Sequence, residues 1–340
     1  MFFTSTKNFK FEDIPDLTGK VVAITGGNTG IGYVTCRELA RKNAHVFVLS
    51  RSIERGKAAV EKIKQETKNQ NVEFLQLDLQ SLKSVKECAE SFLARKLPLH
   101  IFKFSLTVDG IQDQFGTNHV GHFYLTKLLL PTIEASAPSR IVNVSSTAHK
   151  YTPKGGIEFD KLNDPDAQTP MERYGVSKLS NILFTVELNK RLEGKQVYAN
   201  SLHPGVIKTE LTRGLVDNWG RWVVPFIKLG GLLLLTPDDG ALTSLYCATS
   251  PEIEEKKFRG KYFIPFGVES TATLTDDAKD EKLAKKLWEF TDDLIKLQPK
   301  KLKSKNKFHA NVDTNNNNDQ VKGGMGRSKL NSPDFYIHSY

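Results

Sequence analysis

The sequence predicts an α/β fold with a single, doubly wound parallel sheet and helices on both faces. Strand-like and helix-like patterns alternate along most of the 340 residues. A glycine-rich turn joins the first strand to the first helix, and no shift in composition divides the chain before about residue 298. Alternation of this kind makes neighbouring strands parallel, because each helix carries the chain back across the sheet.

The expected strands are short runs rich in apolar and β-branched residues. They cover residues 21–25, 45–50, 72–77, 99–104, 140–145, 196–202 and 261–265. The expected helices are longer segments with apolar residues every three or four positions. They cover residues 30–42, 53–67, 81–95, 113–130, 172–193, 238–249 and 280–296.

One domain is expected over residues 20–298, between an extension of residues 1–19 and a basic, Asn-rich tail of residues 299–340. The composition of the tail is typical of a solvated, disordered segment. Eight Lys/Arg but only three Asp lie from residue 300 onward, so more than half of the net charge of +9 belongs to the tail. The basic pI is therefore largely a property of the tail, and we expect no nucleic-acid partner.

Cysteine usage and hydropathy bear on location. Cys36, Cys88 and Cys247 are odd in number and far apart, which is typical of reduced cysteines in a cytoplasmic protein.

We expect no signal peptide, because the N-terminus has no long apolar run. We also expect no membrane span, which needs about 20 apolar residues. The segment 222–235 is the most apolar, and it fits a membrane surface, a cover over an apolar substrate or a partly buried lid helix.

The run from Thr25 to Gly32 joins the first expected strand to the first expected helix. Gly26 allows a tight turn, Gly30 lets the backbone approach a pyrophosphate, and Gly32 lets the helix pack closely on the sheet. The helix N-terminus offers free N–H groups to phosphates. Strand, turn and helix together predict a Rossmann-type dinucleotide site.

Tyr174 and Lys178 are four residues apart on an expected helix and so share one helix face. An ammonium beside a phenol favours the phenolate, so we expect Lys178 to lower the pKa of Tyr174. Such a phenol can exchange a proton with a carbonyl or alcohol oxygen. Ser145 and Ser146 end an apolar strand at the edge where parallel sheets bind ligands. A serine hydroxyl there can bond a substrate oxygen or cap a helix or turn.

On these residues the chain resembles the short-chain dehydrogenase/reductase family. Asn118 in the run Thr117–Phe123, and His203-Pro204-Gly205 followed by Thr209, match the same family pattern. The run Gly116–His122 and the long interval between Ser146 and Tyr174 are most similar to the retinol-dehydrogenase and WW-domain-oxidoreductase-like branch. The Asn-rich tail favours a fungal member of that branch, some of which associate with lipid droplets or other membranes.

The resemblance implies a role for each matching residue. Tyr174 would be the general acid/base, Lys178 would lower its pKa and hold the nicotinamide ribose, and Ser146 would orient the substrate carbonyl. Asn118 would anchor a water in a proton relay to Lys178. The cofactor would be lined by Gly26, Asn28, Gly30, Ile31 and Gly32 at the pyrophosphate and ribose, Asp78 at the adenine, and Pro204, Gly205, Val206 and Thr209 at the nicotinamide. Asn118, Tyr174 and Lys178 would also belong to the cofactor site. No histidine has carboxylate or Cys neighbours at ligand spacing, so we expect no metal site.

The end of the expected strand 45–50 bears on the choice of cofactor. An NAD site usually has an acidic residue here for the ribose 2′-hydroxyl, whereas this chain has Ser50 and Arg51. An Arg can hold a 2′-phosphate through charge-assisted hydrogen bonds. We therefore expect NADP(H) rather than NAD(H); the alternative is that Arg51 simply faces solvent.

The expected strand 99–104 departs from the family pattern. That strand normally runs into Asn-Asn-Ala-Gly and a loop, and here a segment is missing near residues 101–105. Lys103 would also place an unpaired ammonium in a central strand, which is costly. Three explanations compete: a miscalled exon or splice variant, a shortened but working site, and a non-catalytic family member.

The leading hypothesis is an NADP(H)-dependent oxidoreductase that interconverts an alcohol and a carbonyl. An apolar retinoid-, steroid- or lipid-like substrate is expected, because the family's lid position holds apolar residues such as Trp219 and Trp222. The alternative is a non-catalytic or defective NADP(H)-binding scaffold on a lipid droplet or membrane. A cytoplasmic protein with peripheral contact to a lipid droplet or the ER membrane fits either hypothesis. Many relatives form homodimers through the helix after residue 113 and the Tyr174 helix.

Overall fold

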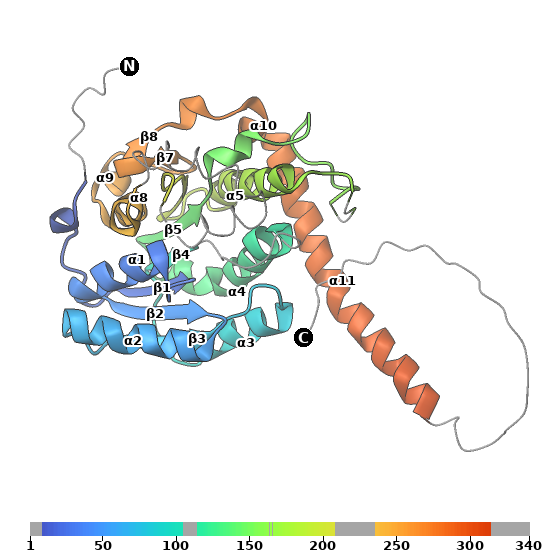
Figure 1. Ribbon diagram of the computed structural model, residues 1–340, viewed down its shortest axis with the longest axis horizontal. Helices are drawn as coiled ribbons and strands as arrows, with labels where there is room; N and C mark the ends of the chain where they lie inside the picture. Colours follow the sequence, from blue (N-terminus) through green and yellow to red (C-terminus); the bar gives the residue numbers. More distant parts are fainter. Residues whose placement is uncertain (1–8, 105–113, 163, 165, 208–234, 314–340) are drawn as a thin grey trace, which may run out of the picture.

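The computed structural model describes residues 9–104, 114–162, 164, 166–207 and 235–313, with side chains as far as residue 297. Its centre is an eight-stranded sheet in the order β3-β2-β1-β4-β5-β6-β7-β8 (Figure 1). All neighbouring pairs are parallel except β7 and β8. The strand order reverses between β1 and β4, as in a doubly wound Rossmann-type sheet. The predicted fold class is confirmed.

All seven expected strands are present. The strands are β1 (Val21–Thr25), β2 (His45–Ser50), β3 (Val72–Gln76), β4 (Ile101–Lys103), β5 (Ser139–Val144), β6 (Val197–Leu202), β7 (Tyr262–Ile264) and β8 (Val268–Glu269). β8 was not expected, because two residues are too short to show an alternating pattern. β4 has half the length predicted for it.

The seven expected helices are also present. They are α1 (Gly30–Arg41), α2 (Ile53–Thr67), α3 (Leu82–Leu93), α4 (Gly121–Ala135), α5 (Pro170–Arg191), α8 (Pro237–Thr249) and α11 (Glu281–Asp313). A π-helical turn, η3 (Gly116–Val120), leads into α4. Short turns not expected from the pattern are η1 (Phe11–Asp13), η4 (Thr147–Lys150), α9 (Glu252–Glu255), η7 (Pro265–Gly267), η8 (Thr271–Thr273) and α10 (Asp276–Lys279).

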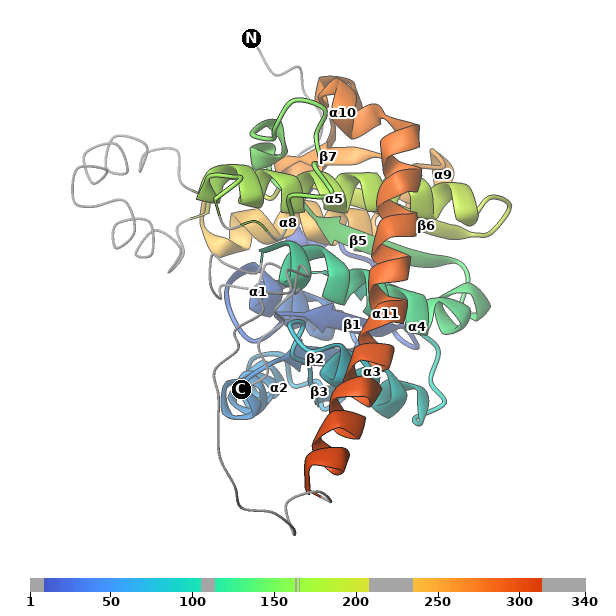
Figure 2. The same cartoon turned by 90° about the vertical axis from the view of Figure 1, so that its right-hand side faces the viewer.

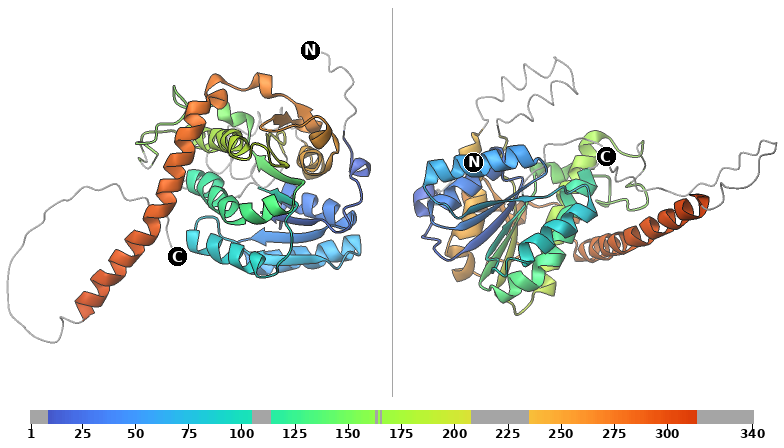
Figure 3. Two further views of the ribbon diagram at one scale, coloured as in Figure 1. Left: turned by 180° about the vertical axis from the view of Figure 1, so that it is seen from behind. Right: turned by 90° about the horizontal axis from the view of Figure 1, so that it is seen from below.

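The sheet lies between two helical layers (Figure 3). Apolar side chains of α1, α2 and α8 pack on one face of the sheet, and those of α3, α4 and α5 pack on the other. The two layers cover both faces of the central strands, which explains why their sequences read as continuous apolar runs.

The helix α11 crosses the outer side of α4 and α5 (Figure 2). The ring of Trp288 stacks on Phe184, with centroids 5.6 Å apart, and meets the edge of Phe123 at 4.7 Å. The far end of α11 projects away from the sheet (Figure 1). The helix runs to Asp313, so the segment expected to be disordered from residue 299 is helical at its start, where Lys and Leu favour helix. Residues 314–340 lie outside the described residues.

The segment before β1 is part of the domain rather than a separate extension. Phe9, Ile14 and Leu17 are buried in the same apolar cluster as α1 and α8. The ring of Phe9 meets the edge of Tyr246 on α8, with centroids 5.6 Å apart. The domain therefore includes residues from Phe9 onward and begins before the predicted boundary at residue 19. Residues 1–8 lie outside the described residues.

The central strand β4 carries an unusual buried charge. Lys103 pairs with Ile24 of β1 and Val142 of β5, and its side chain is 0% exposed. Its Nζ has no hydrogen-bond partner in the described part of the chain. Burial lowers the pKa of this amine to about 8. The shortened strand therefore places a poorly solvated amine in the middle of the sheet.

Candidate active site

The glycine-rich turn has the backbone that a phosphate site needs. Gly26 and Gly30 have φ angles of 60° and 53°, in the left-handed region that favours glycine. Gly30, Ile31 and Gly32 form the first turn of α1, and the last two are buried. The free N–H groups at this helix start therefore lie at the carboxyl edge of β1.

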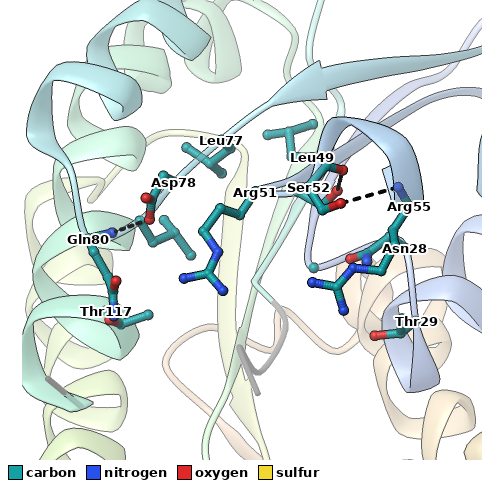
Figure 4. A pocket seen from close by; sticks show the side chains of 13 residues that line it. Asn28, Thr29, Leu49, Arg51, Ser52, Arg55, Leu77, Asp78, Gln80 and Thr117 are labelled. Carbon is teal, nitrogen blue, oxygen red and sulfur yellow. Dashed lines mark hydrogen bonds between the residues drawn. The ribbon is translucent and has the colours of Figure 1, made fainter. Parts of the chain in front are cut away.

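A cavity of about 80 Å³ opens beside this turn, between the ends of β1, β2 and β3 (Figure 4). It is lined by Gly26, Asn28, Thr29, Leu49, Ser50, Arg51, Ser52, Arg55, Leu77, Asp78, Leu79, Gln80 and Thr117. The structure thus brings together four expected cofactor residues: Gly26, Asn28, Arg51 and Asp78. Ligand sites usually span about 300–1,000 Å³, so this cavity fits one end of a dinucleotide.

Two arginines reach this cavity from the same short segment. The guanidinium groups of Arg51, directly after β2, and Arg55, in the first turn of α2, both point into the space shown in Figure 4. Ser52 caps α2 by accepting a hydrogen bond from the Arg55 backbone N–H at 3.3 Å. The cap fixes where the helix starts and so places Arg55 beside Arg51. Arg55 was missed by the sequence analysis, although a second arginine four residues after the first was a readable signal.

Asp78 enters the cavity from the loop after β3. Its carboxylate accepts a hydrogen bond from the Gln80 backbone N–H at 3.0 Å, and its own N–H donates to Ser84 Oγ at 3.0 Å. These two bonds hold the loop against α3. The side chain is therefore kept at the edge of the cavity facing Thr117 (Figure 4).

The second expected constellation lies where α5 passes the end of β5. Ser146 follows β5, and its Oγ accepts a hydrogen bond from the Ala148 backbone N–H at 3.2 Å, capping η4. The Tyr174 side chain also hydrogen-bonds Ser146. The Ser146 hydroxyl can thus cap η4 and also be available, beside Tyr174, to bond a substrate oxygen. Lys178 is on the next turn of α5, with Nζ 5.5 Å from the centroid of the Tyr174 ring.

The pKa shifts correct one expectation. Burial raises the pKa of Tyr174, and the hydrogen bond to Ser146 opposes this shift only in part. Lys178 is 1% exposed, and burial lowers its pKa to about 7, so much of its charge is already lost at neutral pH. The predicted lowering of the Tyr174 pKa by Lys178 was therefore wrong for this geometry. Tyr174 is held as a neutral phenol, the form that donates a proton.

Asn118 lies in the π-helical turn before α4. Its Nδ2 donates to Ser177 Oγ at 3.2 Å, and Ser177 precedes Lys178 on α5. Its backbone oxygen is 3.0 Å from His122 Nδ1, and His122 Nε2 is 2.9 Å from Thr25 Oγ1 at the end of β1. This chain of contacts joins the start of the glycine-rich turn to α5. Single π turns occur frequently at functional sites.

The residues expected beside the nicotinamide follow β6. Gly205 has a φ of 95°, and Val206 is 62% exposed at the edge of the described chain. Gly205 lies beside the Leu235 side chain, and the Leu235 N–H donates to the Val206 oxygen at 2.9 Å. Thr209, Trp219, Trp222 and nearly all of the expected lid segment lie outside the described residues.

The comparisons with known proteins agree with this geometry. A model of the short chain dehydrogenase family matches residues 20–159. An uncharacterised oxidoreductase of Schizosaccharomyces pombe is 41% identical over 87% of this chain and 91% of its own. The chain belongs to the short-chain dehydrogenase family. Retinol dehydrogenase 12 of Mus musculus is 41% identical over 83% of this chain and 88% of its own, which places the chain in the retinol dehydrogenase-like branch.

Solved structures support the fold. An uncharacterised protein of Mycobacterium paratuberculosis is 32% identical, with a TM-score of 0.64, covering 85% of this chain and 98% of its own. L-Sorbose reductase of Gluconobacter frateurii, solved with NADPH and L-sorbose, has a TM-score of 0.60 at 18% identity and covers 77% of this short-chain dehydrogenase and 100% of its own chain. Within the described ranges, none of the helices is long and apolar enough to cross a bilayer.

Proposed function

We propose that this short-chain dehydrogenase is an NADP(H)-dependent oxidoreductase that interconverts a carbonyl and an alcohol. The observation that carries the proposal is the paired placement of Arg51 and Arg55 in the cavity beside the glycine-rich turn. Two guanidinium groups favour a 2′-phosphate, and no acidic residue follows β2 directly to bind a free 2′-hydroxyl. The residues present thus fit a phosphorylated dinucleotide.

The catalytic roles follow from the groups around Tyr174. Bound NADPH supplies a hydride, which is the cofactor's own chemistry. Ser146 hydrogen-bonds a substrate carbonyl oxygen, and Tyr174 donates its phenolic proton to that oxygen as charge develops there. Lys178, with its pKa near neutrality, replaces the proton, with Asn118 and Ser177 alongside it.

The substrate that we propose is apolar, of retinoid, steroid or lipid type. The similarity to retinol dehydrogenases 11 and 12 supports it, and so do the apolar residues of segment 222–235. A peripheral contact with a lipid droplet or the ER membrane would bring such substrates within reach. Flotation of the full chain with lipid vesicles, compared with a chain lacking residues 314–340, tests that contact.

The homodimer stays a proposal. In a dimer through α4 and α5, α11 would lie at the interface, because it packs on both of these helices. Size-exclusion chromatography with light scattering measures the mass directly. A monomeric mass would contradict the homodimer.

A second candidate is a cofactor-binding scaffold without turnover. The short β4, with its buried Lys103, favours it, because this strand ends at the cofactor edge of the sheet. A panel of aldehydes and ketones with NADPH separates the two candidates. Turnover that is lost in Tyr174→Phe supports the enzyme, whereas NADPH binding without turnover across the panel supports the scaffold.

A further inference from the structure

Three polar groups next to Ser146 are buried and have no role in the proposed chemistry. His149 and Tyr262 are each 1% exposed, and His203 is 8% exposed. His149 Nε2, His203 Nδ1 and Tyr262 Oη are buried and have no hydrogen-bond partner in the described part of the chain. Leaving a buried polar atom unpaired costs about 1–3 kcal/mol, so three in one place call for an explanation.

The sheet brings these three side chains together. Tyr262 of β7 pairs with Ser201 of β6, and the His203 N–H donates to the Phe263 oxygen at 2.8 Å, so the ladder continues past β6. Side chains two residues apart on a strand share a face, so His203 lies on the same face of the sheet as Tyr262. The ring of His149 meets that of Tyr262 edge-on, with centroids 5.5 Å apart. This face is the one covered by α5, which carries Tyr174.

The protonation of His149 follows from its contact with Ser146. Its Nδ1 is 2.7 Å from the Ser146 carbonyl oxygen, which can only accept, so Nδ1 carries the proton. The other ring nitrogen, Nε2, is then a lone-pair acceptor. It is buried without a partner in the described part of the chain, in a ring that contacts Tyr262. Burial lowers the pKa of both histidines, and that of His203 falls to about 4, so both rings are neutral at physiological pH.

We propose that His149, His203 and Tyr262 enclose one water molecule, and that His149 thereby positions Ser146. A buried water needs two to four polar partners, and this cluster offers three. Tyr262 donates its hydroxyl proton to the water, the water donates to His149 Nε2, and His203 Nδ1 completes the set. The water fixes the ring of His149, and His149 Nδ1–H in turn holds the carbonyl of Ser146. His149 is a positioning residue, since it acts through the Ser146 backbone.

The test that does not depend on turnover is NMR of the full chain labelled at its histidine ring nitrogens. We expect His149 to be the Nδ1–H tautomer and its pKa to lie below the ordinary histidine value of 6.5. We also expect its Nε2 resonance to shift in Tyr262→Phe but not in Tyr246→Phe, which removes a buried hydroxyl bonded to Glu252. An Nε2–H tautomer, or the same Nε2 resonance in wild type and Tyr262→Phe, would overturn the proposal.

The kinetic test rests on the proposed function. His149→Phe removes both ring nitrogens, and we expect kcat to fall about tenfold or more with the KM for NADPH unchanged, because misplacing a reacting group by 1 Å can cost about 100-fold. His149→Asn keeps a donor near the Ser146 carbonyl and should recover most of that loss. Equal kcat in wild type and His149→Phe would overturn the positioning role. Absence of turnover in the wild type would count against the proposed function alone, since the NMR test would still decide the tautomer and the water.

Discussion

The carbonyl oxygen of Tyr151 occupies the space that a side chain at Gly175 would need: an ideal Cβ at residue 175 would be 2.0 Å from it. This close approach lets α5 pass directly over η4 and so brings Tyr174 to Ser146. We expect Gly175→Ala to push the two segments apart, lowering the free energy of unfolding by about 1–3 kcal/mol. Thermal and urea denaturation measure the loss.

The same substitution should reduce activity more than stability alone explains, because the Tyr174–Ser146 hydrogen bond depends on this contact. Tyr151→Phe is the matched control: it alters an exposed side chain and leaves the contacting backbone oxygen in place. A Gly175→Ala protein with wild-type stability and turnover would mean that α5 tolerates displacement.

Lys103 should make stability depend on pH. Its pKa in the folded protein, about 8, is below the ordinary value of 10.5, so the unfolded chain binds the proton more tightly. The loss of stability from burying the charged amine is fully present below about pH 8. It shrinks as the pH rises and is gone above about pH 10.5. We expect Lys103→Met to stabilise the protein by about 3 kcal/mol at pH 7, since each pKa unit corresponds to about 1.4 kcal/mol.

Urea denaturation at pH 7 and pH 10 checks this prediction, with Lys57→Met on the exposed side of α2 as the control. The advantage of Lys103→Met should be much smaller at pH 10, while the control should change little at either pH. An advantage of the same size at both pH values would point to better apolar packing rather than to the buried amine.

Tyr174→Phe should separate chemistry from binding. The phenyl ring keeps the packing of α5, but it can neither donate a proton nor bond Ser146. We expect kcat to fall by about 100- to 10,000-fold, the usual contribution of a general acid. NADPH affinity should change little, because Arg51 and Arg55 lie at the opposite end of the proposed cofactor site. Residual turnover within a few-fold of wild type would mean that another group supplies the proton.

Inserting the usual Asn-Asn-Ala-Gly segment and its loop after Phe104 should extend β4 beyond Lys103. We expect a higher melting temperature and tighter NADPH binding in the extended protein, because the segment ends a central strand at the cofactor edge. Differential scanning fluorimetry with and without NADPH measures both. Identical melting temperatures and affinities would favour the shortened strand as a working variant.

The parallel sheet and the glycine-rich turn were predictable because they depend on local patterns: apolar runs, periodic helices and glycines at fixed spacing. Other features depend on tertiary packing. The spacing of Phe9, Ile14 and Leu17 does not reveal that they join the buried cluster of Tyr246, which is more than 200 residues away in the chain. The pKa of Tyr174 likewise depends on how deeply its side chain is buried, and this burial raises it, whereas helix spacing predicts a lowering by Lys178. Arg55 could have been noticed from its position four residues after Arg51, but only the structure shows that it lines the cavity.

Cofactor preference is measured by a titration of the purified full chain with NADPH and with NADH, following energy transfer from its tryptophans to the reduced nicotinamide. We expect NADPH to bind at least roughly tenfold more tightly, since a charge-assisted hydrogen bond contributes about 1.5–3 kcal/mol. Arg51→Asp should remove most of this preference, and Arg55→Asp should weaken it. Equal affinity for the two cofactors, or binding of neither, would contradict the central claim that this chain is an NADP(H)-dependent oxidoreductase.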